Sequence, residues 1–359
     1  LNEDAGPQTA AAWATDISSG GGADEAGQSL SFHLSNDNNA LFAVQPTIDP
    51  LSGDLSFTPA DDANGSAVVS LSLQDDGLAN NASPLLSFTI TVNAVNDAPS
   101  FSLGADISVA EDSLPYAQPW TAVYSPGPAD EAGQALSFAL SADPQSLFAV
   151  QPALSPSGVL SFTPAPNAYG TASISIHLSD DGGTDRGGLN TSPDQSFSIT
   201  ITPVNDAPSL SLPPAQTTPE DTPLTLNGFD LGDVDATILT VSIGVSHGSL
   251  TLASAEGITL DSGSNPGASM VLSASAADLL SALNGLVYQP EAEYNGSDEL
   301  SVLVDDNGQT GPEGSQTAQG TVAITVTSQN DAPTLDSIAD QTINEDAVLQ
   351  TMTLTGIST

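Results

Sequence analysis

Val95-Asn96-Asp97-Ala98-Pro99 is the stretch that decides the fold, because its Asn-Asp-Ala-Pro motif recurs in Val204-Asn205-Asp206-Ala207-Pro208 and in Asn330-Asp331-Ala332-Pro333. The intervals are 109 residues (205 − 96) and 125 residues (330 − 205). Each interval has the length of one ordinary domain. Each copy of the motif follows an alternating apolar run, and its proline keeps the preceding residue in an extended backbone conformation. We therefore predict a tandem array of domains joined by short, stiff, acidic linkers.

The first two intervals are duplicates of one another. Three short segments recur at offsets of 106, 106 and 105 residues: Asp24–Gln28 at Asp130–Gln134, Leu41–Pro46 at Leu147–Pro152, and Leu55–Ala60 at Leu160–Ala165. Apolar residues alternate strictly between these words, as in Leu30, Phe32 and Leu34. Short alternating runs separated by Gly, Pro, Asn and Asp are typical of antiparallel β-sandwiches.

The predicted fold is all-β, a series of tandem antiparallel sandwiches. We place them at residues 1–97, 98–206 and 207–331, with the start of a fourth repeat at 332–359. The third is divergent, and the spacing of apolar residues over Ala274 to Leu286 predicts one short helix there.

The two ends of the chain resemble each other. Ile343-Asn344-Glu345-Asp346-Ala347 matches Leu1-Asn2-Glu3-Asp4-Ala5 at an offset of 342 residues. The first sandwich lacks the dozen residues that precede Glu111 and Glu220 in the later ones, which predicts that its first strand is missing. Either the array continues beyond these residues, or the tail completes the first sandwich of a neighbouring chain by head-to-tail strand addition.

The charge of the chain limits its partners. It has 44 Asp and Glu, one basic side chain (Arg186) and a formal net charge of -43. Nucleic acid and anionic membranes are excluded as electrostatic partners because both require basic patches. There is no Cys to form disulfides and no apolar run long enough for a membrane span. Clustered acids in such a chain need external cations.

Acids and amides recur at four places in each repeat: an early Glu-Asp pair, a middle cluster, a late Asp-Asp pair and the Asn-Asp of the linker. The candidate metal ligands are therefore Glu3, Asp4, Asp75, Asp76, Asn96, Asp97, Glu111, Asp112, Asp130, Glu131, Asp180, Asp181, Asn205, Asp206, Glu220, Asp221, Asp233, Asp235, Asp305, Asp306, Asn330 and Asp331.

Calcium (Ca2+) is the cofactor that this set suits, because it accepts six to eight oxygen ligands in irregular geometry, whereas magnesium demands an octahedron. The alternative is that Asp, Asn and Gly merely form solvated turns. That alternative explains single Asp-Gly pairs, but it does not explain acids paired at matching places in successive repeats.

The combination of an early Glu-Asp, Asp233-x-Asp235, a late Asp-Asp-x-Gly and Val-Asn-Asp-Ala-Pro resembles the tandem cadherin-like and Ig-like repeats of giant bacterial surface adhesins of the RTX type. The resemblance covers nearly the whole chain and implies calcium bound between adjacent domains. It implicates Glu3, Asp75 and Asp97 with Asp130 at the first joint, and Glu111, Asp180 and Asp206 with Asp233 and Asp235 at the second. The first two repeats depart from the pattern with Asp24-Glu25 and Asp130-Glu131 in place of Asp-x-Asp, and glycine-rich RTX nonapeptides are absent.

Catalysis is not expected. No nucleophile stands at motif spacing from His33, His177 or His247, and paired acids alone would allow a glycosidase, which also needs aromatic sugar platforms. Trp13 and Trp120 occupy equivalent places near the starts of two repeats, where packing in the core or between the sheets is the expected role.

The sequence thus predicts a calcium-stiffened stalk of a secreted, cell-surface adhesin, whose partners are the neighbouring repeats of the same chain. A glycan- or protein-binding module and a filament or surface-layer subunit are the alternatives. Nothing in the sequence names a receptor.

Overall fold

The computed structural model describes residues 1–22, 25–78, 81–121, 123–333, 335–355 and 357, and Asp24 lies outside this set. The chain separates into two compact units, residues 1–109 with 113–201, and residues 110–112 with 202–359. We use first, second and third repeat for residues 1–97, 98–206 and 207–331, and tail for residues 332–359.

The first repeat is a sandwich of two three-stranded antiparallel sheets, ordered β1-β4-β3 and β2-β5-β6. Alternate side chains of both sheets, such as Phe57 and Val69, point into one buried core. The elements are β1 Gln8–Ala10, β2 Leu30–Asn36, the 3-10 turn Asn39–Leu41, β3 Phe42–Ile48, β4 Leu55–Pro59, β5 Gly65–Asp75 and β6 Leu86–Val92.

The second repeat has the same plan with more strands. Its sheets are ordered β11-β14-β15-β8 and β12-β13-β9, and a short pair, β7 with β10, lies beside them. The elements are β7 Ser100–Phe101, β8 Ile107–Ala110, β9 Tyr116–Pro119, β10 Tyr124–Ser125, β11 Ser137–Asp143, β12 Phe148–Leu154, β13 Val159–Pro164, β14 Gly170–Ser179 and β15 Gln195–Thr202, with 3-10 turns at Ala129–Glu131, Gln145–Leu147 and Asp185–Gly187.

The third repeat pairs a six-stranded sheet, β17-β26-β25-β20-β23-β22, with the three-stranded sheet β18-β24-β21. β17 runs parallel to β26, and the short strands β16 and β19 form a separate pair. The bounds are β16 Ser209–Ser211, β17 Gln216–Pro219, β18 Leu224–Leu226, β19 Asp230–Gly232, β20 Leu239–Gly244, β21 Gly248–Thr251, β22 Thr259–Gly263, β23 Ser269–Ala274, β24 Leu286–Pro290, β25 Gly296–Asp305 and β26 Thr317–Thr327.

The predicted helix of the third repeat is confirmed as α1, Ala276–Leu283. It begins where the Ser275 hydroxyl accepts a hydrogen bond from the Asp278 backbone N–H at 3.2 Å, an N-cap. Its buried residues, Leu279, Ala282 and Leu283, have the spacing of one helical face and join the core of this repeat. The all-β sandwich prediction is likewise confirmed.

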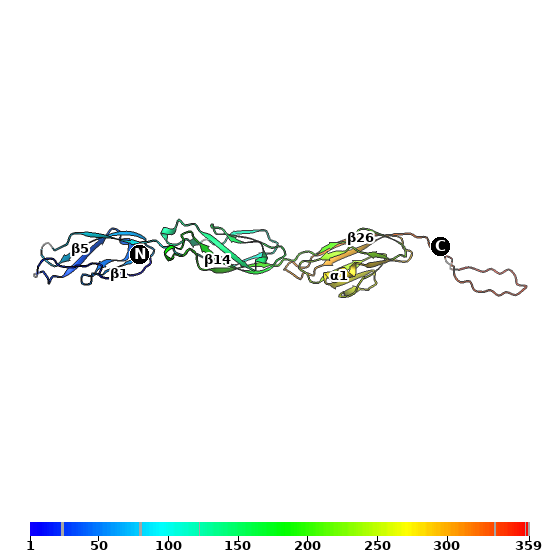
Figure 1. Cartoon of the computed structure of the whole chain (residues 1–359). Coiled ribbons are helices and arrows are strands. Elements are labelled where there is room, and N and C mark those ends of the chain that lie inside the picture. Colours follow the sequence, from blue (N-terminus) through cyan, green and yellow to red (C-terminus); the bar gives the residue numbers. More distant parts are fainter. Residues whose placement is uncertain (23–24, 79–80, 122, 334, 356, 358–359) are drawn as a thin grey trace. The chain divides into compact units, whose positions relative to one another are not determined.

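Each repeat contains one or two long strands, and β5, β14 and β26 are labelled in Figure 1. β5 and β14 have 11 and 10 residues, and β25 has 10. At about 3.3 Å per residue such a strand is roughly 30 Å long, so the loops at its two ends are far apart.

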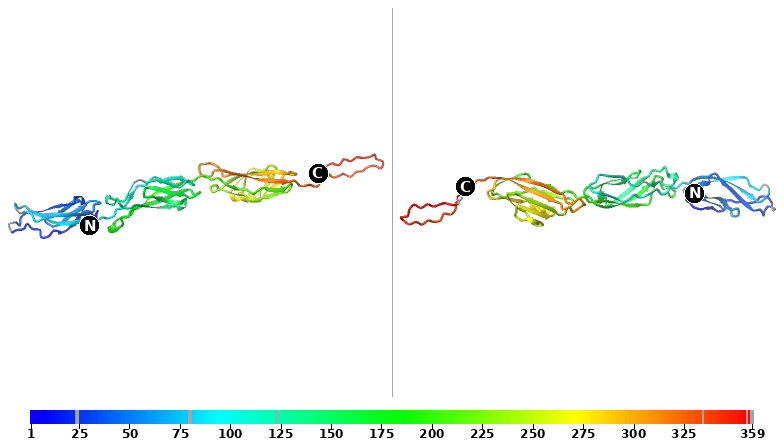
Figure 2. Two further views of the ribbon diagram at one scale, coloured as in Figure 1. Left: turned by 90° about the horizontal axis from the view of Figure 1, so that it is seen from above. Right: turned by 180° about the vertical axis from the view of Figure 1, so that it is seen from behind.

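The tail contains no strand among its described residues, and both views of Figure 2 draw it as a plain trace. Every described residue from 328 to 357 is exposed. No helix formed by the described residues combines the length and the apolar character that crossing a bilayer would need.

Candidate metal centres at the joints

In each repeat, one buried glutamate binds the linker that follows the repeat. Glu3, Glu111 and Glu220 are 5%, 2% and 5% exposed. Each donates its backbone N–H to a carbonyl at or just after the last strand of its own repeat, namely that of Asn93, Thr202 or Thr327. Each carboxylate accepts the N–H of the residue before the linker asparagine: Val95 at 2.5 Å, Val204 at 2.9 Å and Gln329 at 2.5 Å. The same two contacts therefore recur in all three repeats.

At the first joint, acids of the second repeat reach the same linker. Glu131 Oε1 accepts the Asp97 backbone N–H at 2.9 Å, and Asp180 Oδ1 accepts from Asn96 Nδ2 at 2.9 Å. The Asn64 amide nitrogen lies 2.6 Å from Asp130 Oδ2. Carboxylates from both repeats consequently lie around the linker, and Asp130 and Glu131 of the middle cluster are among them.

The second joint repeats this scheme in the other compact unit. Asp235 Oδ2 accepts the Asp206 N–H at 2.9 Å, and Asp233 Oδ1 accepts the Asp235 N–H at 2.7 Å, which turns the Asp-x-Asp loop towards the linker. The Asn205 amide donates to Asp306 Oδ2 at 2.6 Å. Asp235 therefore performs the role that Glu131 performs at the first joint.

Several joint oxygens are buried without a hydrogen-bond partner. Within the described part of the chain, the carboxylate oxygens of this kind are the second oxygens of Glu131 and Asp180 at the first joint, and of Glu111, Asp206 and Asp233 at the second. A buried carboxylate oxygen without a partner is costly. Oxygen donors grouped in this way fit a hard cation with a high coordination number, which is the chemistry of calcium.

Electrostatics support the same interpretation. Burial raises the pKa of Asp97 and Glu131 at the first joint and of Glu111 and Asp206 at the second, and neighbouring acids raise each further. For Asp206 those neighbours are Asp112, Asp235 and Asp233. The joints therefore resist holding all their negative charges unless a cation compensates them.

Two three-acid clusters lie at the joints. In the first, one carboxylate oxygen from each of Asp4, Asp62 and Asp97 lies within 4.8 Å of the other two. The second consists of Asp221, Glu293 and Asp331 under the same limit, and there the pKa of Glu293 is raised first by Asp331 and then by Asp221. Asn330 at this third joint is exposed.

Asp62 and Glu293 are not among the ligands predicted from the sequence. Both have positive φ, 55° and 60°, as does Asn167 at 54° in the second repeat. Their backbone N–H groups donate to the first cluster's Asp4 and the second's Asp221, at 3.1 and 3.3 Å. A signal was present: all three residues stand three positions after a proline and three before a glycine. Because this position holds Asp, Asn and Glu in the three repeats, a search for a repeated acidic motif does not find it.

The predicted place of the late Asp-Asp pair is wrong. We assigned Asp75 to the first joint and Asp180 to the second, the joint that follows their repeat. Instead Asp180 contacts Asn96 and Asp306 contacts Asn205, so the pair serves the joint that precedes its repeat. The reason is strand length, because β5, β14 and β25 each separate this pair from the opposite end of the sandwich.

Other members of the late pairs accept hydrogen bonds from backbone N–H groups. Asp75 Oδ1 accepts the Gly77 N–H at 2.7 Å, and Asp305 Oδ1 accepts the Asn307 N–H at 2.7 Å. Asp76 and Asp181 accept the backbone N–H of Ser29 and Ala135 at 3.2 and 2.8 Å. For Asp75 and Asp305 the solvated-turn interpretation has direct structural support, whereas Asp76 and Asp181 bind residues 47 and 46 positions away.

Comparisons with known proteins give likenesses of structure alone. No protein-family model matches the chain, and no curated protein matches it. The extracellular cadherin domains 1–5 of protocadherin gamma B2 match at 14% identity and a TM-score of 0.42, covering 84% of this chain and 53% of that one. Domains EC22–24 of mouse cadherin-23 match at 13% identity and a TM-score of 0.38, covering 84% and 86%.

A third likeness is to immunoglobulin domains 1–5 of Sidekick-1, at 15% identity and a TM-score of 0.27, covering 84% of this chain and 52% of that one. This chain thus spans about half the length of the protocadherin chain and of the Sidekick chain. At such identities and scores the likenesses carry no argument about function, and the sandwich architecture rests on the strands themselves.

Proposed function

We propose that this chain is an extender segment, a stalk, of an extracellular adhesion protein, and that calcium at the joints stiffens it. The observation that supports this most is the set of buried, unpartnered carboxylate oxygens at two successive joints of a chain with a single basic side chain. The duplicated contacts of Glu3 and Glu111 support the proposal that the same chemistry serves both joints.

At the first joint, Glu3, Asp4, Asp62 and Asp97 would hold calcium together with residues of the second repeat, Asp130, Glu131 and Asp180. At the second joint, Glu111, Asp112 and Asp206 would act with Asp233, Asp235 and Asp306. Bound calcium supplies positive charge that neutralises these acids. The linker asparagines and backbone N–H groups orient the carboxylates before any ion binds.

We further propose that the chain works outside the cell, as a repeat segment of a giant bacterial adhesin of the RTX type. Calcium is abundant there, and a ligand that binds only the folded state stabilises it by mass action. The -43 charge also disfavours nonspecific binding to nucleic acid and anionic membrane.

The decisive experiment is a calcium titration of the full chain, with melting temperature and small-angle X-ray scattering recorded on the same samples. Calcium should raise the melting temperature and narrow the distribution of particle dimensions, and a chelator should reverse both changes. Magnesium at equal concentration should have a clearly smaller effect, because the carboxylate-rich sites suit irregular coordination. Unchanged melting and unchanged scattering across the titration would refute the proposal.

A control separates ion binding at the joints from general charge screening. Sodium chloride at matched ionic strength should give only a fraction of the calcium effect, because screening acts on all 44 acids whereas calcium acts on the joints. Glu111→Gln should weaken the calcium response of the second joint, whereas Asp49→Asn should not, since Asp49 lies in a turn and accepts from Leu51 and Ser52.

A further inference from the structure

The buried glutamate that binds the linker has its second oxygen satisfied in two repeats and open in one. A single position decides this, the residue immediately before the glycine that begins β5, β14 or β25, which is Asn64, Tyr169 or Asn295. Asn64 Nδ2 donates to Glu3 Oε2 at 3.2 Å, and Asn295 Nδ2 donates to Glu220 Oε2 at 3.2 Å. Where the position holds tyrosine, Glu111 Oε2 is buried without a hydrogen-bond partner among the described residues.

At the first joint the Asn64 side chain also connects the two repeats. Its amide nitrogen lies 3.2 Å from Glu3 Oε2 of the first repeat and 2.6 Å from Asp130 Oδ2 of the second. The two N–H groups of one amide are enough to serve both oxygens. We call this contact the amide bridge and define it by Asn64, Glu3 and Asp130. Its hydrogens occupy lone pairs that a cation between these carboxylates would use, so amide and cation compete for the same oxygens.

The linker asparagines show the same contrast. Asn96 Oδ1 accepts a hydrogen bond from Gln134 Nε2 at 2.6 Å at the first joint. Its counterpart at the second joint, Asn205 Oδ1, is buried and has no partner within the described residues. Side-chain amides therefore satisfy the second oxygen of Glu3 and the oxygen of Asn96, whereas the matching oxygens of the second joint are open.

A positive charge is also built into the first joint. Arg186 is the only Lys or Arg of the chain, and its Nη1 donates to the carbonyl of Ala94, just before the linker, at 3.4 Å. Arg186 lines a cavity of about 290 Å³ together with Asp130 and Glu131. Its guanidinium offsets part of the negative potential that would attract a cation to these acids. The second joint has no Lys or Arg to do the same.

The open oxygens consequently come from different parts of the two joints. At the first joint the buried, unpartnered ones belong to the second repeat, on Glu131 and Asp180. At the second joint they belong to the preceding repeat, the linker and the following repeat, on Glu111, Asn205, Asp206 and Asp233. All three parts of the second joint thus offer oxygens that no hydrogen bond has to release.

We propose that the two joints respond to calcium separately. The amide bridge holds the first joint in the absence of calcium and lowers its affinity for the ion, whereas the second joint is held only by calcium and fills first. This inference rests on the proposed function, because it assigns the calcium response to particular joints. The affinities should differ by at least about tenfold, since releasing one hydrogen bond to a charged group costs about that factor.

The test is fluorescence resonance energy transfer across one joint at a time in the full chain. The sequence has no Cys, so pairs of introduced cysteines can carry the dyes. Ser87, Ser175 and Ser301 are exposed serines on β6, β14 and β25. Ser87→Cys with Ser175→Cys reports on the first joint, and Ser175→Cys with Ser301→Cys reports on the second.

We expect the two reporters to separate. In EDTA the distance distribution across the second joint should be broad, whereas that across the first joint should stay narrow. During a calcium titration the second joint should change at a concentration at least about tenfold below the one that changes the first.

Exchanging the residues at the shared position tests the cause. Asn64→Tyr removes the amide bridge, so the first joint should broaden in EDTA and its calcium midpoint should fall about tenfold. Tyr169→Asn gives Glu111 the amide that the other two repeats have, so the midpoint of the second joint should rise by a similar factor. Each variant carries a residue that another repeat accepts at the same position, so both should fold.

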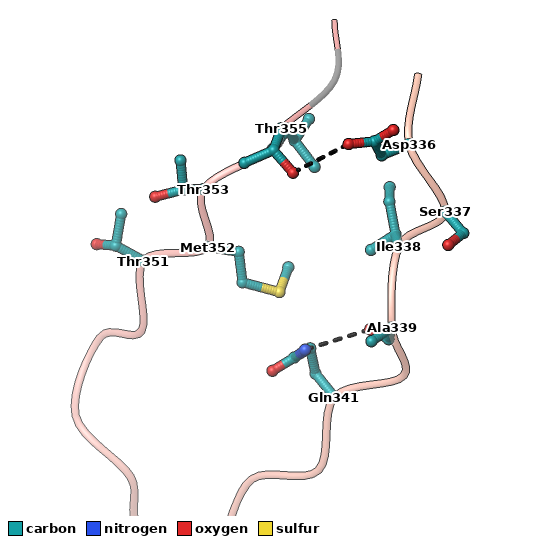
Figure 3. A pocket seen from close by; sticks show the side chains of 10 residues that line it. Asp336, Ser337, Ile338, Ala339, Gln341, Thr351, Met352, Thr353 and Thr355 are labelled. Carbon is teal, nitrogen blue, oxygen red and sulfur yellow. Dashed lines mark hydrogen bonds between the residues drawn. The ribbon is translucent and has the colours of Figure 1, made fainter. Parts of the chain in front are cut away.

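Arg186→Gln tests the built-in charge. It should lower the calcium midpoint of the first joint and leave that of the second unchanged. Gln341→Glu is the matched control, because it also makes the net charge more negative by one unit but belongs to neither joint. Figure 3 shows Gln341 hydrogen-bonded to the Ala339 carbonyl, at 3.2 Å, on a stretch of the tail that lies in no sheet.

The outcomes distinguish this inference from the proposed function. If neither joint responds to calcium, both are wrong. If both joints change at the same calcium concentration, the proposed function stands and the separate response is wrong. If Asn64→Tyr raises the midpoint of the first joint, Asn64 is itself a calcium ligand, and the competition between amide and cation is refuted.

Discussion

Replacing Asp62 by Asn should change the stability of the first repeat in opposite directions with and without calcium. Asp62 belongs to the cluster with Asp4 and Asp97, in which one oxygen of each lies within 4.8 Å of the others. Its φ of 55° is tolerated by asparagine, and the second repeat has Asn167 at the same position with φ 54°. Backbone strain therefore does not enter the comparison.

The magnitude follows from the geometry of this cluster. At 4.8 Å two unit charges repel by about 0.9 kcal/mol in water, and Asp62 takes part in two of the three pairs. Screening at physiological ionic strength reduces the sum to about 1 kcal/mol, because the Debye length is about 8 Å. For a repeat of this size, about 1 kcal/mol corresponds to a rise of roughly 4–8 °C in melting temperature without calcium.

With saturating calcium the sign reverses. The substitution removes one carboxylate ligand, and a tenfold loss of affinity lowers the stabilisation by about 1.4 kcal/mol. Differential scanning calorimetry of the full chain in EDTA and in calcium resolves both changes, with Asp16→Asn as the control, since Asp16 has φ 54° and lies outside the cluster. A decrease of equal size in both buffers would show that Asp62 only shapes a turn.

Three further predictions concern pH, a buried acid and the core. Burial raises the pKa of Glu111 and Asp206, so their contribution to stability is complete at low pH and is lost as pH rises through the raised pKa values. The calcium-free chain should therefore become more stable as pH falls from 7 to about 4.5. Glu111→Gln should flatten this dependence in urea titrations; an equal slope in both proteins would contradict it. Asp306→Ala should cost about 3 kcal/mol in chemical unfolding, because Asp306 is fully buried and accepts from Asn205, Gly308 and Gln316, whereas Asp305→Ala should cost far less. Phe162→Ala should cost about 3–5 kcal/mol with and without calcium, since Phe162 is 2% exposed in the core of the second repeat; a calcium-dependent cost in melting experiments would argue against separate core and joint contributions.

The sandwich fold could be predicted because its signals are local. Alternation along Val69 and Leu71 determines which face of β5 is buried, and the repeated linker word marks where one repeat ends. A capping serine and the spacing of apolar residues likewise indicate the helix α1. None of these features requires knowledge of a distant contact.

The joints were only partly predictable because they depend on which end of a strand a loop occupies. The late Asp-Asp pair and the early Glu-Asp pair look equivalent in sequence, yet Asp180 follows the ten-residue strand β14 and contacts Asn96, which lies in the linker before its repeat. Asp62 and Glu293 could not be predicted as members of the acidic clusters for another reason. Their common property is a left-handed backbone conformation between a proline and a glycine, not a common side chain.

The three glutamates that bind the linker N–H groups have a consequence for how such chains can change over generations. At every junction a buried glutamate of the preceding repeat binds the same linker N–H group, so excising or duplicating one whole repeat rejoins ends that already share this contact. Reach could thus be lengthened or shortened by recombination without redesigning any interface, and variants of different length should fold equally well.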